Sequence, residues 1–187
     1  MRSSSMTVIG GWVGRQTGRA LLCVFAGTIL LALSARVEIP FWPVPFTMQT
    51  FVVLALGLVY GPMLGAATVL TYLGQGLLGL PVFAAGGGPA YLAGPTGGYL
   101  IGMVPAAWIA GQLALRGWVR HPVSAVLAAG LANAAVYVVG VGWLAAWMGS
   151  LEQAIAAGLL PFLPGAAMKI AGAGLVGWAM TRLARRG

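Results

Sequence analysis

Long apolar stretches, separated by short groups of Gly, Pro and Arg residues, dominate the chain. No side chain between Ile39 and Leu115 is charged. That run exceeds one membrane-spanning helix, which needs about 20 apolar residues to cross ~30 Å of hydrocarbon. Gly61-Pro62 and the Gly/Pro-rich stretch 79–98 divide it into shorter pieces. The whole pattern predicts membrane-spanning helices over six ranges, namely 20–36, 48–60, 63–78, 99–115, 122–148 and 161–181.

The range 48–60 is short, so Gly61-Pro62 could instead kink a single helix and leave five crossings. The arginines favour six crossings, because only then do eight of them fall on one side of the membrane. These eight are Arg2, Arg15, Arg19, Arg116, Arg120, Arg182, Arg185 and Arg186. By the positive-inside rule, both termini are then cytoplasmic and the loops 36–47, 79–98 and 149–161 face outward. The prediction is an all-α membrane protein with six transmembrane helices.

Composition supports a membrane protein over a soluble one. Of the 187 residues, 60% are hydrophobic and 6% are charged, whereas soluble domains have about 25% charged residues. The length suits a single integral membrane domain over residues 1–187, and the N-terminal stretch lacks the features of a cleavable signal. The net charge of +8 comes from residues at segment ends, which indicates contact with an anionic bilayer surface and no nucleic-acid partner.

The scarcity of reactive side chains excludes most enzyme classes. The chain has no Asp, one His, one Cys and two Glu, Glu38 and Glu152, which are far apart in sequence. Paired carboxylates, nucleophile–base pairs and metal-binding clusters are therefore absent, so we expect no catalysis, no metal and no cofactor. No Gly-rich loop ends in Lys-Ser or Lys-Thr, so the chain cannot hydrolyse ATP by itself.

Lys169 is the single most informative residue. It lies eight residues after Pro161, about 12 Å along a helix, in the last apolar range. An ammonium in a spanning segment costs on the order of 2.5–3.5 kcal/mol, and a bound anion such as a substrate carboxylate would offset that cost. The alternative is a lysine whose long side chain reaches the outer headgroups.

The outer loops contain the other candidates for a ligand site. Thr47 and Gln49 offer neutral hydrogen-bonding groups at the start of the second helix, after two prolines that hold the chain extended. Glycines in 79–98 allow the backbone to approach a ligand closely. Because this segment is apolar, we expect it to fold over the bundle as a lid, although it could be an ordinary connector.

Some polar and small residues have two interpretations. Arg36 and Glu38 are predicted to pair with each other at a helix end. Asn133, in the middle of its helix, could bond a neighbouring helix or the ligand. Cys23 and Gly27 form a small-residue stripe, which could contact a separate helix or pack internally.

Four motifs of the outer loops resemble the BioY family, the biotin-specific substrate-binding (S) components of energy-coupling-factor (ECF) transporters. They are PVPFTMQT at 43–50, GLPVFAAGGG at 79–88, GPTGGYL at 94–100 and PFLPGAAMK at 161–169. The resemblance implies a six-helix S-component bundle in the bacterial plasma membrane that binds biotin from outside beneath the first and third loops. It also implies partnership with a coupling transmembrane component and ABC-type ATPase subunits.

One position departs from the family pattern. Lys169 matches the lysine of the family's PGD-x-x-K motif, but Ala166 stands where that motif usually has Asp. The resemblance implies that the Asp–Lys pair holds the polar groups of biotin. Here the ureido N–H groups need another acceptor, for which Thr47, Gln49, Asn133, Tyr91 and loop carbonyls are the candidates.

The sequence thus predicts a membrane-embedded biotin-binding subunit for biotin uptake, with an apolar pocket lined by aromatic residues such as Phe41. The predicted substrate-binding residues are Lys169, Gln49, Thr47, Trp42, Phe83, Gly87, Tyr91, Tyr99 and Asn133. A stand-alone secondary transporter of a small organic anion or vitamin is the alternative, although such proteins usually carry more titratable groups within the membrane. An intramembrane enzyme ranks last.

Overall fold

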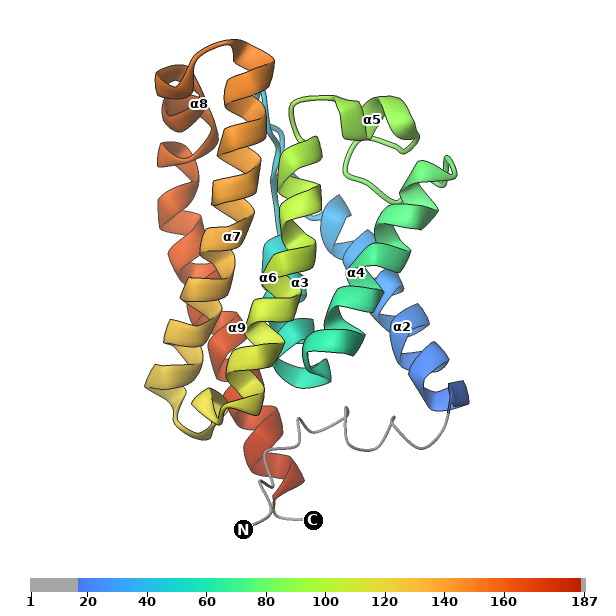
Figure 1. Cartoon of the computed structure of the whole chain (residues 1–187), viewed down its shortest axis with the longest axis vertical. Helices are drawn as coiled ribbons and strands as arrows, with labels where there is room; N and C mark the ends of the chain where they lie inside the picture. The colour runs from blue at the N-terminus through green and yellow to red at the C-terminus, as the bar shows by residue number, and fades with distance from the viewer. Residues whose placement is uncertain (1–16, 186–187) are drawn as a thin grey trace.

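The computed structural model describes residues 17–185, most of which are helical (Figure 1). The long helices are α2 (Thr17–Arg36), α3 (Gln49–Tyr60), α4 (Pro62–Leu77), α6 (Gly97–Leu115), α7 (Pro122–Met148) and α9 (Leu163–Ala184). The connections contain α5 (Pro89–Ala93), α8 (Leu151–Gly158), the 3-10 turns η1 (Trp118–Arg120) and η2 (Leu160–Phe162), and the hairpin strands β1 (Glu38–Ile39) and β2 (Phe46–Thr47). Arg2, Arg15 and Arg186 lie outside the described residues.

Four helical stretches in the described part of the chain are long and apolar enough to cross a membrane. They are Thr17–Arg36, Gly97–Leu115, Pro122–Met148 and Leu151–Ala184, the last of which includes α8 and α9. With 12 and 16 residues, α3 and α4 are only about 18 and 24 Å long. Six crossings and the cytoplasmic termini therefore stay predictions.

Gly61-Pro62 reverses the chain between α3 and α4. Gly61 has φ +85°, a conformation that glycine adopts easily, and Pro62 takes the first helical position of α4. A Cβ on Gly65 would lie 3.1 Å from the Cα of Gly57. Eight residues along one continuous helix would separate these positions by about 12 Å. Two antiparallel helices meeting at this turn therefore replace the single kinked helix of the alternative reading.

Small residues let the helices around α6 approach closely. A Cβ on Gly57 of α3 would lie 2.5 Å from the carbonyl oxygen of Ala107, and one on Gly98 would overlap the side chain of Trp143 on α7. Within a bilayer, apolar side chains are as stable in lipid as against another helix, so no hydrophobic effect drives helices together. Their association depends instead on close backbone packing of this kind. Helix α6 therefore lies between α7 on one side and α3 and α4 on the other (Figure 1).

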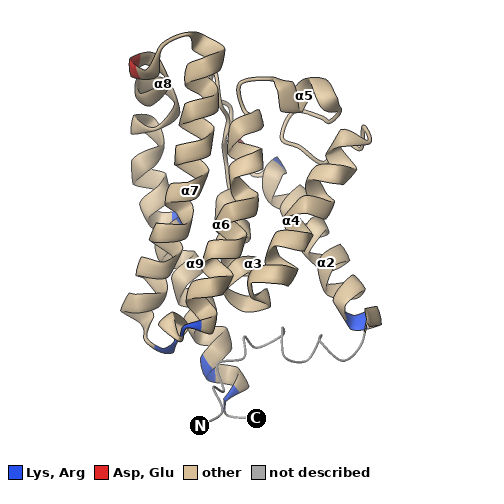
Figure 2. Cartoon of the chain, viewed as in Figure 1, with Lys and Arg blue, Asp and Glu red and all other residues tan. Residues whose placement is uncertain are grey.

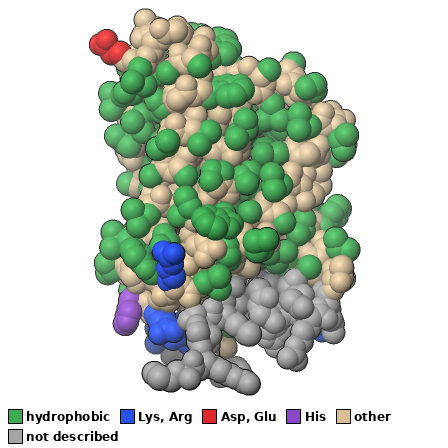
Figure 3. All heavy atoms as spheres, viewed as in Figure 1, with side chains coloured by type: hydrophobic (Ala, Val, Ile, Leu, Met, Phe, Trp, Pro, Cys, Tyr) green, Lys and Arg blue, Asp and Glu red, His purple; other side chains and the backbone are tan. Residues whose placement is uncertain are grey.

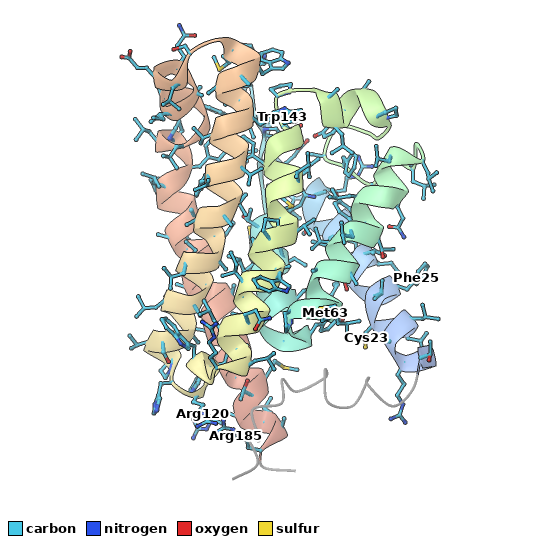
Figure 4. The ribbon with its side chains drawn as sticks, viewed as in Figure 1. Cys23, Phe25, Met63, Arg120, Trp143 and Arg185 are labelled. Carbon is cyan, nitrogen blue, oxygen red and sulfur yellow. The ribbon has the colours of Figure 1, made fainter. Side chains whose placement is uncertain are left out.

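Helix α2 lies at the edge of the bundle and turns its small residues inward. Gly27 is buried against Thr68 and Tyr60, which come from α4 and α3. The opposite face of α2 exposes large apolar side chains, among them Phe25 (Figure 4). Of the two interpretations of the Cys23 and Gly27 stripe, the structure therefore supports internal packing.

Segment 149–161, predicted as a loop, contains helix α8. Ser150 caps it, because its hydroxyl accepts a hydrogen bond from the backbone N–H of Gln153. Tyr99 of α6 donates to the carbonyl oxygen of Gly158 at 2.9 Å, which fixes α8 against the bundle. The eight-residue helix was missed because its short apolar pattern is indistinguishable from that of a connector.

Charged side chains lie mainly at the two ends of the bundle. The end formed by η1 and the C-terminal part of α9 contains basic segments, while an acidic segment lies on α8 at the opposite end (Figure 2). Hydrophobic side chains cover much of the surface between the two ends (Figure 3). Segments 36–47, 79–98 and 149–161 gather at the α8 end, which we call the outer end after the orientation that the sequence predicts.

Candidate functional site

A chamber opens beneath the loops of the outer end. Its empty volume is about 560 Å³, including space that is open to solvent. Loop 36–47, the lid segment 79–98 and helices α3, α6, α7 and α9 all contribute to its wall. The lining residues are Val44, Pro45, Thr47, Gln49, Thr50, Ala84, Tyr91, Thr96, Tyr99, Leu100, Met103, Val136, Tyr137, Phe162 and Lys169.

Lys169 is the one buried charged side chain in the described part of the chain, with 8% of its surface exposed. Its Nζ donates to the carbonyl oxygen of Thr47 at 2.9 Å and lies 4.0 Å from the centroid of the Phe46 ring. A carbonyl dipole and an aromatic face both stabilise a cation, but neither neutralises it. Because the ammonium has further hydrogens to donate, the chamber wall can bind an oxygen atom of a ligand.

The hairpin positions the two groups that meet Lys169. Phe46 pairs with Ile39 and Thr47 with Glu38 in the antiparallel β1–β2 register. The Phe46 ring packs directly on Gly165 of α9, where no larger residue would fit. The hairpin thus fixes the Thr47 carbonyl oxygen and the Phe46 ring at Lys169, one turn further along α9.

The segment 79–98 covers the chamber as a lid. Phe83 is fully buried and contacts Tyr72 edge-to-face and Tyr91 in a stacked arrangement, with ring centroids 5.5 and 5.2 Å away. The lid supplies Ala84, Tyr91 and Thr96 to the chamber wall. It is therefore packed into the bundle and is more than an ordinary connector.

Hydrogen bonds from three helices hold the lid backbone. The hydroxyl of Tyr72 on α4 donates to the carbonyl oxygen of Val82 at 2.9 Å. Trp143 Nε1 on α7 donates to the carbonyl oxygen of Gly94 at 2.9 Å, and Figure 4 shows this tryptophan beside the lid. The guanidinium of Arg36, at the end of α2, donates to the carbonyl oxygens of Pro81 and Ala84.

Arg36 does not form the predicted pair with Glu38. Its hydrogen bonds go to the lid, and no ion pair joins the two side chains within the described residues. A guanidinium presents several N–H donors in a fixed plane, so it suits two neighbouring carbonyl oxygens. Sequence proximity favoured Glu38, whereas the fold brings the carbonyl oxygens of a segment more than 40 residues away into reach.

Arg36→Ala is expected to loosen the lid without unfolding the bundle. Removing two hydrogen bonds from a charged donor should raise hydrogen–deuterium exchange at the Phe83 and Gly88 amides, by roughly tenfold. In the closed lid these amides donate to the carbonyl oxygens of Gly86 and Gly76. Mass spectrometry of the purified protein would measure the exchange. Arg116→Ala, at the opposite end, is the control, and unchanged exchange in Arg36→Ala would contradict the clamping role.

The structure brings five of the predicted residues together. Lys169, Gln49, Thr47, Tyr91 and Tyr99 all line the chamber. Burial raises the pKa of the Tyr91 hydroxyl above its ordinary value. The hydroxyl of Tyr91 therefore stays protonated at neutral pH and can donate to a ligand.

Four predicted residues lie elsewhere. Trp42 is 75% exposed at the outer end, and Phe83 anchors the lid from outside the chamber wall. The backbone at Gly87 lies against the carbonyl oxygen of Leu80, where a Cβ atom would clash. Glycine at this position therefore allows the lid to pack on itself. Asn133 is buried on α7, one turn before Tyr137, and is not among the residues that line the chamber.

Several wall residues were not predicted. Tyr137 and Val136 come from α7, Met103 from α6, and Phe162 from η2, where its ring stacks on Phe46 at 5.6 Å. Their apolar character resembles that of every other buried position, so composition could not single them out. Thr96 and Val44 lie within motifs that were noticed, and their proximity to Thr47 and Tyr91 was the available signal.

The chamber suits a neutral or anionic organic molecule with an apolar body. Its wall combines aromatic and aliphatic side chains with hydroxyl groups, one amide and one ammonium, and no carboxylate lines it. Such a set orients a ligand by a few hydrogen bonds while burying its apolar surface. No group of three or more His, Cys, Asp or Glu side chains that could hold a metal occurs among residues 17–185.

Comparison with known proteins identifies relatives over most of the chain. Residues 6–186 match the model of the BioY family. The "Biotin transporter BioY" of Thermotoga maritima is 37% identical over 83% of this chain and 92% of its own length. The "Probable biotin transporter BioY" of Pyrococcus horikoshii is 42% identical over 72% of this chain and 78% of its own. A crystal structure of an S-component for biotin from an ECF-type ABC transporter is also similar. Its TM-score is 0.78 at 26% identity, and the match covers 92% of this chain and 94% of that one.

Proposed function

The chain belongs to the BioY family, and from this premise we propose that the chamber around Lys169 is where it captures biotin from the outer side of the membrane. Lys169, Gln49, Thr47, Tyr91 and Tyr99 are the proposed binding residues, together with Thr96 and Tyr137. The Lys169 ammonium binds an oxygen atom of biotin, and the aromatic walls hold its bicyclic ring and hydrocarbon chain.

The function is biotin uptake, and the chain is a substrate-binding S component and not an enzyme. Its sequence has no phosphate-binding loop, so the energy for transport comes from elsewhere. An ECF module with ABC-type ATPase subunits is the partner that supplies it.

The main support for assigning the biotin site to this chamber is the buried ammonium of Lys169 in its wall, beneath the lid. The ammonium has lost most of its hydration, and its described protein partners are a carbonyl oxygen and an aromatic ring, neither of which is charged. A ligand with electron-rich oxygens offsets that loss. Biotin carries such oxygens at both ends, in its ureido group and in its carboxylate.

The proposed topology has six crossings, with α3 and α4 as the short pair and both termini in the cytoplasm. Basic segments at the η1 end and the apolar surface between the two ends support it (Figures 2 and 3). The exposed apolar face of α2 would then contact lipid. The location proposed is the bacterial plasma membrane.

A proton-coupled secondary transporter is less well supported. Such transporters place titratable groups within the membrane. In the part of the chain that the structure describes, Lys169 is the one buried charged side chain.

Cysteine labelling in the presence and absence of biotin tests the site and its orientation. Cys23→Ser removes the one natural cysteine, after which Thr96→Cys and Ser124→Cys place single thiols at the chamber and at the opposite end. In intact cells, a membrane-impermeant maleimide should label position 96 and spare position 124. Biotin should protect position 96 from labelling, whereas thiamine should not. Labelling of 124 alone would overturn the orientation, and absence of protection at 96 would overturn the site.

A further inference from the structure

A chain of buried hydrogen bonds connects the chamber to the lid. The hydroxyl of Thr47 lies 3.2 Å from Gln49 Oε1, and Gln49 Nε2 lies 2.6 Å from the hydroxyl of Tyr72. That hydroxyl in turn lies 2.9 Å from the carbonyl oxygen of Val82 in the lid. Gln49 is 3% exposed and Tyr72 is fully buried, so water does not compete for these groups.

The lid carbonyl fixes the direction of every bond in this chain. A backbone carbonyl oxygen can only accept, so Tyr72 must donate its single hydroxyl hydrogen to Val82. The oxygen of Tyr72 is then left as an acceptor, and the group of Gln49 that faces it must be the NH2. The amide oxygen Oε1 therefore points to the other side, toward Thr47.

This fixed direction gives the chamber a side-chain acceptor of defined position. Neither Glu38 nor Glu152 lines the chamber, and Ala166, buried on α9, provides no polar group. The other neutral polar side chains of the wall are hydroxyls, which rotate and can either donate or accept. Gln49 Oε1 accepts only, and its present donor, the Thr47 hydroxyl, can turn aside when a ligand N–H arrives.

We propose that Gln49 Oε1 accepts a hydrogen bond from an N–H group of the bound ligand, and that Tyr72 is the positioning residue that holds the amide in this orientation. The inference rests on the proposed function, in which the ligand is biotin and the N–H belongs to its ureido ring. Gln49 thus supplies a hydrogen-bond acceptor in a chamber wall that has no carboxylate. Thr47 links the two groups, because its hydroxyl donates to Gln49 Oε1 and its carbonyl oxygen accepts from Lys169 Nζ.

Tyr72→Phe tests the proposal because it removes one oxygen atom and leaves the ring packing in place. Biotin is compared with a ketone analogue in which CH2 replaces each ureido N–H, by calorimetric titration of the purified full-length protein. Tyr72→Phe should weaken biotin binding by about tenfold, the effect of one buried hydrogen bond, and change binding of the ketone analogue by less than about twofold. Tyr60→Phe is the matched control, since Tyr60 lies on α3 outside the chamber, and should leave both affinities unchanged.

Gln49→Leu completes a double-mutant cycle and serves alone if Tyr72→Phe does not fold. It should weaken biotin binding by about tenfold or more and spare the ketone analogue. In the Gln49→Leu background, Tyr72→Phe should have no further effect on biotin, because the two residues act as one unit.

Equal weakening of both ligands in Tyr72→Phe, unchanged biotin affinity, or additive effects in the cycle would overturn the inference while leaving biotin binding in place. Wild-type protein that does not bind biotin would overturn the proposed function and the acceptor role with it.

Discussion

Lys169→Ala is expected to weaken biotin binding by about 10- to 100-fold. Hydrogen bonds from a charged donor contribute about 1.5–3 kcal/mol, and each 1.4 kcal/mol is a factor of ten in affinity. The ammonium is almost fully buried, bound to the Thr47 carbonyl oxygen and facing the chamber, so a ligand oxygen would meet it with little competition from water. Titration of the purified protein with radiolabelled biotin measures the effect.

Two comparisons make the Lys169 result specific. Arg182→Ala removes a basic residue near the far end of the same helix, where its guanidinium lies over Trp178, and should leave affinity unchanged. Biotinamide, which lacks the carboxylate, shows which end of biotin meets the ammonium. If Lys169 binds the carboxylate, the substitution will affect biotin far more than biotinamide; if it binds the ureido oxygen, both will weaken alike. Unchanged affinity for biotin would remove Lys169 from the site.

Phe83→Ala is expected to increase the rate of biotin dissociation by at least about tenfold. Phe83 is the largest apolar side chain that holds the lid, packed between Tyr72 and Tyr91 and against Gly76. Truncating a buried Phe costs about 3–5 kcal/mol, and here the cost is borne by the closed position of the lid. A filter-binding chase with unlabelled biotin measures the dissociation rate.

The controls for Phe83 separate lid packing from general stability. Phe83→Leu keeps most of the apolar volume and should change the rate by only a few-fold. Phe25→Ala removes the same side chain from the exposed face of α2, where 61% of its surface is accessible (Figure 4). It should leave the dissociation rate unchanged. Slow dissociation from Phe83→Ala would mean that the lid does not retain the ligand.

The family and the uptake function could be identified from short motifs. The PVPFTMQT, GPTGGYL and PFLPGAAMK segments resembled BioY proteins, and the family model and the relatives confirm that assignment. Lys169, Thr47 and Gln49 were found from their chemistry, because polar groups stand out in a chain that is otherwise apolar. The structure places all three in one chamber wall.

Residues that act through packing were predicted less well. Trp42 and Phe83 were both expected in the pocket, yet Trp42 is exposed and Phe83 is buried where the lid packs against α4. Aromatic side chains in a loop look alike in sequence, and the path of the loop backbone decides which way each one points. Arg36 was assigned to its neighbour Glu38 for a similar reason, because sequence distance was the only distance available.

The sequence by itself determined where the six long helices run, which single cation lies buried among them and which loops contribute to the chamber wall. Apolar runs and glycine–proline breaks are local features, and a chain with so few charges can meet water only at its ends. The tertiary structure alone decided that Gln49 meets Tyr72, that Tyr72 meets the lid and that Tyr137, but not Asn133, lines the chamber. Those contacts depend on how helices rotate and approach one another through small residues. No local period of hydrophobic positions encodes that geometry.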